Sequence, residues 1–421
     1  MSKPLYSWII VGISFANVAT AYGLTFSFSI FFVAILEEFS WSRACTAGAF
    51  SLSALLLGIG SWLAGRLVDR FGSRKILLGG VIILSFSTFA SGWIQEVWHL
   101  YALFGVFGAL GGCGLGWVPH SVLLSDWFVQ KRGTMVGIAF SGMGAGILIL
   151  GPLSQFLISS SGWRIAYMIL GSMVFIFLLP LNCMVRNRPS ERNGLSTPNR
   201  SNPTTTVHEP EKSEAPDWTL GRAIRTLPFW CLTIAFFLLP LGIFPVIVHQ
   251  VAYIIDHGYS RILAASILGA TGFLSSIGRL LFGTLYDRIG WEKAVTWSFV
   301  CSIAGIVILL LIPSLRAIFW LYLYALLFGL GFGARGPIVV AMMADFYHGK
   351  HFGSIYGFIN IGNGIGGALG PWLAGYLHDA TGSYKISFLT CIPILLGACV
   401  LFWMAGGSRR RKRGGNSEKS P

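Results

Sequence analysis

The sequence predicts an all-α membrane protein with twelve transmembrane helices in two pseudo-symmetric halves of six. Three observations predict this fold class. The composition is strongly apolar, apolar stretches long enough to cross a membrane recur along the chain, and short landmarks of the first half return in the second half at a nearly constant spacing.

The composition excludes a soluble enzyme of ordinary domains. Of the 421 residues, 54% are hydrophobic and only 11% are charged, and the mean hydropathy is +0.69. A soluble domain carries about 25% charged residues. The seven cysteines occur singly inside apolar runs, so neither a metal site nor a disulfide framework is indicated. We expect no cofactor.

Apolar stretches between short polar breaks predict the twelve spans. Glycine-rich stretches count as helices, because an open sheet edge cannot lie in lipid. The first span has no cleavage site of a signal peptide, so we expect it to be retained. The predicted spans are residues 6–34, 43–66, 76–95, 98–122, 134–158, 164–185, 228–255, 261–284, 293–313, 316–341, 352–377 and 385–405.

The positive charges predict the orientation in the membrane. With twelve spans both termini lie on one side, and 23 of the 30 Lys and Arg residues fall on that side. By the positive-inside rule we expect both termini to be cytoplasmic. The net charge of +14 is then a matter of topology, and no nucleic-acid partner is expected. Five positive residues fall on the other side: Arg43, Arg164, Arg261, Arg316 and Lys385.

One polar segment divides the spans six and six. Residues 186–226 are rich in Pro, Ser, Thr, Asn and charge, a composition that cannot bury a core. We therefore expect an N-terminal six-helix bundle (1–185), a cytoplasmic linker (186–226) and a C-terminal six-helix bundle (227–405). A basic cytoplasmic tail (406–421) follows, which either meets anionic lipid headgroups or is simply solvated.

The two halves share landmarks at one offset. The segment 65-GRLVDRFGSRK-75 matches 283-GTLYDRIGWEK-293 at an offset of 218 residues, and 126-DWFVQKR-132 matches 345-DFYHGKH-351 at 219. Gly151-Pro152 matches Gly370-Pro371, again at 219. Repeated six-span halves are typical of secondary transporters, which bind substrate between the halves near the membrane midplane.

The first of these landmarks predicts a conformational latch. A Gly lets two helices approach, an Asp can accept hydrogen bonds from a helix N-terminus, and the basic residues face headgroups. The alternative is a role in topology and packing only. The latch candidates are Gly65, Asp69 and Arg70 in the first half and Gly283, Asp287 and Arg288 in the second.

These motifs resemble those of the major facilitator superfamily. The resemblance rests on twelve spans, on G-x-L-x-D-R-x-G in both halves and on Gly-Pro in the fifth span. Within it, 127-WFVQKRGTMVGIAFSGMGAG-146 is similar to a signature of the monocarboxylate transporters, and 6-YSW-8 keeps part of their first signature. Bacterial relatives include proton-linked lactate carriers and oxalate/formate exchangers.

Two charged side chains remain deep inside the predicted spans, Arg279 and Arg335. They lie roughly 12 Å and 15 Å along their helices from the cytoplasmic loops. No Asp or Glu lies at a similar depth in any span. Because an intramembrane Arg costs at least about 2.5–3.5 kcal/mol, each needs a partner or a purpose. A guanidinium matches a carboxylate with two parallel hydrogen bonds, so both are candidates for binding an anionic substrate.

The internal repeat and the resemblance separate these two arginines. Both lack a counterpart in the first half, where Ser61 and Gly116 hold the equivalent positions. The segment 278-GRLLFG-283 matches the span whose Arg binds the substrate carboxylate in monocarboxylate transporters, which implies that role for Arg279. The alternatives are snorkelling for Arg279 and, for Arg335, capping of carbonyls freed near Pro337.

The sequence departs from this family at three positions. Ser275 stands where the family has an Asp one turn before the Arg, and Phe26 stands where it has a Lys. Asn363 stands where oxalate exchangers have a Lys. The first two departures put the proton route in doubt, and the third removes a partner for a doubly charged substrate.

The proton-coupling candidates are His249 and Asp256, which share one face of the seventh span with Tyr253. A histidine titrates near neutral pH and suits a proton relay. The alternative for His249 is a hydrogen-bonded wall residue. Further candidates for contact with substrate, each with packing as its alternative, are Tyr22, Trp117, Asn360 and Asn363.

The function expected from these observations is secondary active transport of small monocarboxylates of the lactate or pyruvate type, coupled to protons. Carboxylate exchange of the oxalate/formate type and a non-transporting sensor on the same scaffold remain alternatives. An enzyme is not expected, because no nucleophile–base pair lies in the spans. We expect as partners the monocarboxylate, a proton and the bilayer, with no obligate protein partner. The expected location is a bacterial inner membrane, because no targeting extension precedes the first span.

Overall fold

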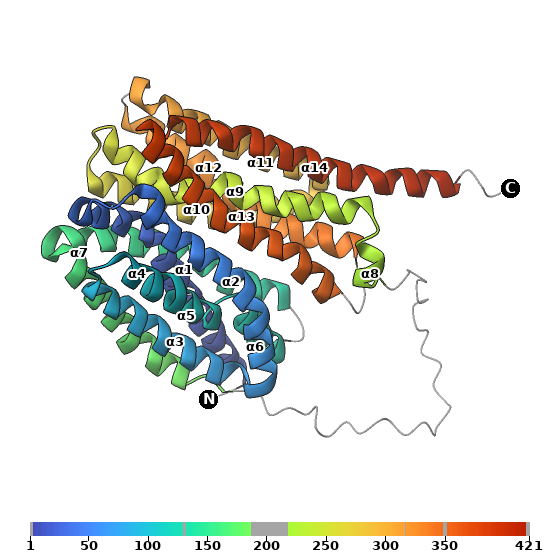
Figure 1. The fold of residues 1–421 in the computed structure, drawn as a ribbon. Coiled ribbons are helices and arrows are strands. Elements are labelled where there is room, and N and C mark those ends of the chain that lie inside the picture. Colours follow the sequence, from blue (N-terminus) through green and yellow to red (C-terminus); the bar gives the residue numbers. More distant parts are fainter. Residues whose placement is uncertain (1–2, 129–131, 187–217, 316, 348–351, 418–421) are drawn as a thin grey trace.

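The protein is all-helical in a computed structural model that describes residues 3–128, 132–186, 218–315, 317–347 and 352–417 (Figure 1). Helices up to residue 183 form one bundle, the N-half: α1 Lys3–Phe39, α2 Arg43–Phe71, α3 Ser73–Ala90, the 3-10 turn η1 Ser91–Trp93, α4 Val97–Leu100, the π-helix η2 Tyr101–Gly108, α5 Ala109–Gly114, α6 Trp117–Trp127 and α7 Arg132–Cys183. The rest form the C-half: α8 Leu220–Ala223, α9 Leu227–Asp256, α10 Arg261–Ile289, α11 Trp291–Leu315, α12 Ile318–Phe346, α13 Phe352–Thr381 and α14 Lys385–Ser417.

The all-helical prediction is confirmed, with two differences in detail. Ten stretches in the described part of the chain are long and apolar enough to cross a membrane. One of them lies in α7, a 52-residue helix that joins the fifth and sixth predicted spans across the non-helical Gly162. The glycine-rich α13 is 30 residues long but is not among the ten, because its described part is less apolar.

The repeat seen in the sequence recurs in the backbone. The six residues with positive φ in the described ranges form three pairs, Ser40 with Gly258, Gly72 with Gly290, and Gly162 with Gly382. Their spacings are 218, 218 and 220 residues. Gly72 and Gly290 are the last glycines of the repeated G-x-L-x-D-R-x-G motif. Each ends a long helix in a left-handed conformation that glycine adopts without strain.

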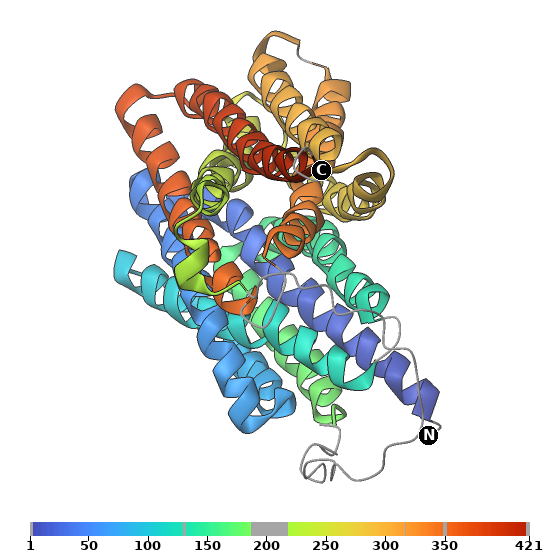
Figure 2. The same cartoon turned by 90° about the vertical axis from the view of Figure 1, so that its right-hand side faces the viewer.

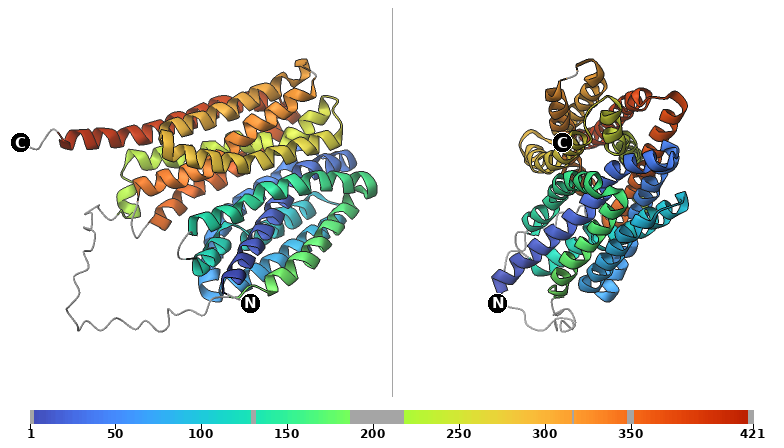
Figure 3. Two further views of the ribbon diagram at one scale, coloured as in Figure 1. Left: turned by 180° about the vertical axis from the view of Figure 1, so that it is seen from behind. Right: turned by 90° about the vertical axis from the view of Figure 1, so that its left-hand side faces the viewer.

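The halves lie side by side, with their long helices roughly aligned (Figures 1 and 2). We call the end at which α1 begins and α7 and α14 end the terminal end, and the opposite end the distal end. The halves converge at the distal end and spread apart toward the terminal end (Figure 1). Across the seam between them α2 packs on α13, α7 on α10 and α1 on α9. Figure 3 shows α7 and α10 from behind.

Glycine allows α7 to approach α10 closely. A side chain at Gly144 would overlap Ser276 and the carbonyl group of Gly272 on α10. This contact fixes the depth at which Arg279, less than one turn beyond Ser276, faces the N-half. Packing of small residues is the usual way for helices to approach in lipid.

Candidate functional site: a guanidinium at the seam

Arg279 reaches from α10 across the seam to the N-half. Its Nη1 donates to the carbonyl oxygen of Phe140 at 3.1 Å, and its Nη2 lies 3.3 Å from the sulfur of Met143. Both partners are on α7. In the described part of the chain no carboxylate pairs with Arg279. The guanidinium is part-buried and keeps most of its positive charge uncompensated.

Trp117 lies against this guanidinium because span 4 is interrupted. Helix α5 ends at Gly114, and α6 begins at Trp117 after a two-residue break at Leu115 and Gly116. The Arg279 guanidinium carbon is 5.9 Å from the Trp117 ring centre, and the ring stacks on Phe140 with centres 3.9 Å apart. Broken helices in transporters mark substrate sites, because the positive end of a half-helix can face an anion.

Tyr22 completes this cluster from α1. Its ring packs edge-on against Trp117 with centres 6.5 Å apart, and it lies within electrostatic range of Arg279. The structure thus brings together three of the predicted substrate residues, Arg279, Trp117 and Tyr22. We call this set, with Phe140 and Met143, the seam cluster. The last two contribute only a ring, a sulfur and a carbonyl group, so no charge in the sequence pointed to them.

A small cavity lies next to the seam cluster on its distal side. Phe26 lines it and meets Phe332 of the other half edge-on, at 6.2 Å between ring centres. Gln250 lines it too, with its amide oxygen bonded to the Tyr324 hydroxyl at 2.8 Å. The lining residues are Phe26, Ile147, Ile247, Gln250, Leu268, Thr271, Gly272 and Phe332.

Ser275 and Phe26, which stand where the family has an Asp and a Lys, are both buried among neighbouring residues. Phe26 is surrounded by aromatic rings of both halves, including Phe50 at 6.3 Å and Phe244 at 6.5 Å between centres. Ser275 is buried, and its hydroxyl donates to the Gly272 carbonyl within its own helix at 2.6 Å. Neither position offers a titratable group to the seam.

Arg335 lies apart from the seam cluster. Its side chain is buried inside the C-half, where Nη2 donates to the Ser302 hydroxyl at 2.6 Å and the guanidinium lies 5.0 Å from the Phe299 ring centre. Its Nε and Nη1 have no hydrogen-bond partner in the described part of the chain. The expectation that Arg335 binds substrate is not supported by this orientation, because Ser302 and Phe299 belong to α11, which lies away from the seam.

Asn360 and Asn363 are both on α13. Asn360 is half-buried and Asn363 is exposed. Helix α13 packs on α2 and α9, whereas the seam cluster is formed by α1, α6, α7 and α10. The two asparagines are therefore not brought to Arg279 in this conformation.

The two proton-coupling candidates lie toward the distal end and are linked by other residues. His249 is fully buried, with Nδ1 3.0 Å from the Tyr384 hydroxyl and Nε2 3.0 Å from the carbonyl oxygen of Pro371. Asp256 forms an ion pair of 2.9 Å with Arg43 of the N-half. Arg43 also donates to Tyr384 at 2.8 Å. No motif in the sequence marks Arg43 or Tyr384 as functional residues.

The latch candidates lie at the terminal end, where the halves are spread. Gly65 and Gly283 are half-buried, and Arg70 and Arg288 are exposed. The side chains of Asp69 and Asp287 are outside the described part of the structure. The described bonds that tie the halves together as ion pairs are at the distal end instead, between Arg43 and Asp256 and between Arg261 and Glu37.

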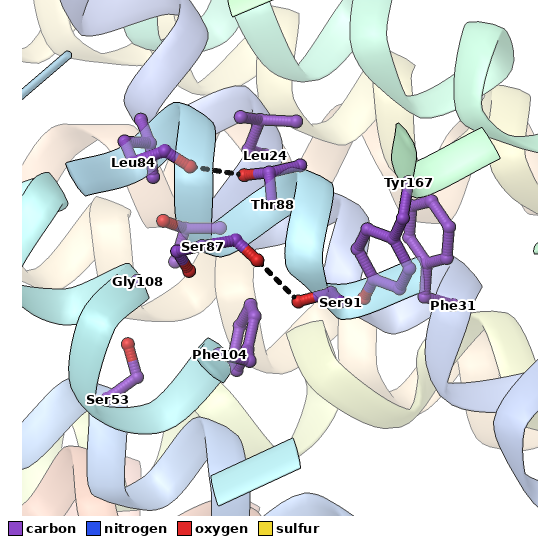
Figure 4. A pocket seen from close by; sticks show the side chains of 11 residues that line it. Leu24, Phe31, Ser53, Leu84, Ser87, Thr88, Ser91, Phe104, Gly108 and Tyr167 are labelled. Atoms are coloured by element: carbon purple, nitrogen blue, oxygen red, sulfur yellow. Dashed lines mark hydrogen bonds between the residues drawn. The ribbon is translucent and has the colours of Figure 1, made fainter. Parts of the chain in front are cut away.

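A second cavity lies inside the N-half rather than at the seam (Figure 4). Hydroxyl groups line it, including those of Thr25, Ser87 and Ser91, and the π-helix η2 contributes Phe104 and Gly108. The hydroxyl of Tyr167 is buried here without a hydrogen-bond partner in the described residues, while its ring stacks on Phe31 at 3.7 Å. This cavity has no charged lining residue and is separate from Arg279.

Two repeated helical bundles that meet along a seam are the architecture of a secondary transporter. The chain belongs to the major facilitator superfamily, whose family model matches residues 13–339 and 317–421. The predicted resemblance is thereby confirmed.

Curated relatives are monocarboxylate transporters. Monocarboxylate transporter 2 of Homo sapiens is 26% identical over 413 residues, covering 96% of this chain and 85% of the relative. Monocarboxylate transporter 13 of Bos taurus is 27% identical over 394 residues, covering 93% and 87%. These relatives are transporters and not enzymes, in agreement with the sequence analysis.

A solved structure of low identity has the same fold. A bacterial homologue of the human lysosomal transporter Spinster, in an inward-facing and unoccupied conformation, aligns with a TM-score of 0.72 at 19% identity. The alignment covers 96% of this chain and 98% of that one.

Proposed function

We propose that this protein carries small monocarboxylates of the lactate or pyruvate type across the membrane together with a proton. The observation that carries the proposal is the guanidinium of Arg279, which faces the seam. Its partners are a carbonyl group, a sulfur and an aromatic ring, and none of the described carboxylates pairs with it. A carboxylate can displace these weak partners and form two parallel charge-assisted hydrogen bonds.

The rest of the seam suits a short carbon chain. Phe26 and Phe332 from opposite halves enclose the cavity beside the seam cluster, and Ile147 and Leu268 add further apolar surface. An apolar pocket with one polar anchor is the common design of small-molecule sites.

Alternating access follows from the two-bundle architecture. The halves meet at the distal end and spread at the terminal end (Figure 1). The positive-inside rule favours a cytoplasmic terminal end, so we assign this conformation to the cytoplasm-facing state, with both termini in the cytoplasm. Binding of a carboxylate neutralises Arg279 and removes the electrostatic cost of closing the seam around a bare charge. A bacterial inner membrane stays a prediction.

Exchange of one carboxylate for another is the second candidate, and a specific observation favours it. Phe26 and Ser275 occupy the positions of the family's Lys and Asp. Phe26 packs against other aromatic rings, and the Ser275 hydroxyl donates to a carbonyl group of its own helix. A carrier without these groups has less obvious means of coupling to protons.

The experiment that separates the two is uptake into liposomes that contain the purified protein. We expect labelled lactate to accumulate under an inward proton gradient with no counter-anion inside. Uptake that requires a preloaded anion and ignores the proton gradient would establish exchange. A panel of short acids, measured in the same vesicles, would name the substrate, and failure of every acid would refute the proposal.

A further inference from the structure

The first turn of α2 is completed by a carboxylate of the other half. The backbone N–H of Arg43 donates to Asp379 Oδ1 at 3.0 Å, and that of Ala44 donates to Oδ2 at 2.8 Å. The next N–H, of Cys45, is capped locally by Ser42. A helix leaves its first N–H groups without partners, and a carboxylate there is favoured by both hydrogen bonding and the helix dipole. Asp379 on α13 therefore holds the distal end of α2.

The side chain of Arg43 reinforces this contact. Its guanidinium pairs with Asp256 on α9 at 2.9 Å and donates to the Tyr384 hydroxyl on α14 at 2.8 Å. Main chain and side chain of this residue together contact three helices of the C-half. The halves cannot separate at the distal end unless all of these bonds break.

The contact related to this one by the internal repeat is a single ion pair. Arg261 corresponds to Arg43 at the offset of 218, and it pairs with Glu37 of the N-half at 2.7 Å. Both side chains are about half exposed, at 49% and 46%. Ser160 stands where an equivalent of Asp379 would be, at the offset of 219. Asp379 thus has no counterpart in the N-half. The pair of Arg261 and Glu37 is exposed, and exposed ion pairs contribute little to stability.

We propose that Asp379 is a proton-binding residue whose protonation releases α2 and opens the distal end. An ionised carboxylate accepts both N–H groups and attracts the helix dipole, whereas the neutral acid loses its charge and part of its acceptor capacity. The closed end therefore binds the ionised form better than the neutral form. By linkage, acid shifts the protein toward the state in which the halves are separated there.

Several other groups that titrate or carry charge face Asp379. They are Arg43 and Cys45 on α2, Asp256 and His249 on α9, His378 on α13 and Tyr384 on α14. Arg43 stays charged, and Asp256 is already paired with it. The proposal rests on the alternating access described above but not on the identity of the substrate.

His249 is less suited to take up the proton in this conformation. Its Nε2 faces a carbonyl oxygen and must donate, which leaves Nδ1 to accept from the Tyr384 hydroxyl. The neutral ring thus satisfies both neighbours. A second proton would add a positive charge close to Arg43, which already donates to the same hydroxyl.

The test is a distance measurement in the absence of any substrate. In a background without native cysteines, spin labels are placed by Gln95→Cys in the N-half and Ser314→Cys in the C-half, two exposed positions near the distal end. Pulsed electron–electron resonance in lipid nanodiscs then reports the separation of the halves. We expect the population with the longer distance to grow several-fold from about pH 7 to about pH 3, because a released aspartate takes up its proton only near pH 4 and below.

The substitution Asp379→Asn should give a large long-distance population at both pH values, with the pH dependence lost. If the pH dependence persists in Asp379→Asn, another group such as His378 titrates and the proposal is overturned. Asp379→Glu keeps an ionisable group and should retain the pH dependence. It also shows that substitution at this position is compatible with folding.

Glu37→Gln is the matched control, because it removes the ion pair on the other side of the repeat without touching the α2 cap. It should leave the pH response within about twofold of the unmodified protein, as expected for an exposed pair. An effect equal to that of Asp379→Asn would overturn the proposal. Because no substrate is present, failure here is distinguishable from failure of the proposed transport, which the liposomes test separately.

Discussion

At the scale of single residues, the chemistry depends on what surrounds each arginine. Arg279 and Arg335 are both cations of the C-half and lie at similar depths along their helices, but Arg279 is part-buried and Arg335 is buried. Arg279 faces a carbonyl group and a sulfur across the seam, whereas Arg335 faces a serine and a phenyl ring within its own bundle. The first guanidinium therefore faces the seam between the halves, and the second faces the interior of the C-half.

Arg279→Lys should reduce carboxylate uptake by about tenfold to a hundredfold although it keeps the charge. An ammonium cannot offer the parallel pair of donors, and a charge-assisted hydrogen bond contributes about 1.5–3 kcal/mol. The measurement is initial uptake in liposomes at matched protein content. Arg261→Lys, in an exposed ion pair, is the control and should transport normally. Near-normal uptake by Arg279→Lys would remove the anchor from the proposed site.

Tyr167→Phe should leave the stability unchanged or slightly raised. The hydroxyl is buried without a partner in the described residues, so its removal abolishes an unmet desolvation cost. Tyr384→Phe is the matched comparison, because that hydroxyl bonds both Arg43 and His249, and we expect a loss of about 1–3 kcal/mol. Thermal unfolding in detergent measures both. A clear loss in Tyr167→Phe would indicate an ordered water in this cavity.

At the scale of elements, the seam is set by where helices can approach and where they break. Gly144 lets α7 meet α10, and the interruption at Leu115 and Gly116 turns Trp117 toward Arg279. Neither feature follows from hydropathy. A glycine in an apolar run predicts close packing but not its partner, and the break in span 4 has no proline or charge at its start.

Gly144→Ala should impair transport strongly, because the added methyl group overlaps Ser276 and the Gly272 carbonyl group on the opposing helix. Gly137 is one turn or more away on the same helix, and a methyl group there meets no atom within 4 Å. Gly137→Ala should therefore transport normally and be more stable by about 0.5–1 kcal/mol. The measurements are the initial rate of uptake in liposomes and the thermal unfolding of Gly144→Ala and Gly137→Ala. Equal activity would show that this contact is dispensable.

At the scale of the whole molecule, proton-coupled movement of a monocarboxylate is electroneutral. An imposed membrane potential should leave lactate accumulation unchanged in liposomes, with the potential set by a potassium gradient and valinomycin. One net charge that crosses the full field would change accumulation about fiftyfold for each ~100 mV. A response of that size would exclude one-to-one symport.

Much of the architecture is predictable from the sequence, because hydropathy and the 218-residue repeat both report on whole helices. The absence of any carboxylate at its depth also marked Arg279. Its twin Arg335 shows the limit, because depth along a helix does not say which face carries the side chain. The Asp379 contact was out of reach for another reason. It joins residues 336 positions apart, and only knowledge of which helices meet across the seam reveals it.

The carboxylate that completes α2 has a consequence for how the chain is built. The first two N–H groups of α2, in the N-half, donate to the two carboxylate oxygens of Asp379, which is synthesised more than three hundred residues later. Before the C-half has been synthesised, and whenever the distal end is open, water must accept the hydrogen bonds of these N–H groups. The first N–H groups of α2 therefore have protein partners only while the distal end is closed, so their protection from hydrogen exchange should report which conformation the carrier is in.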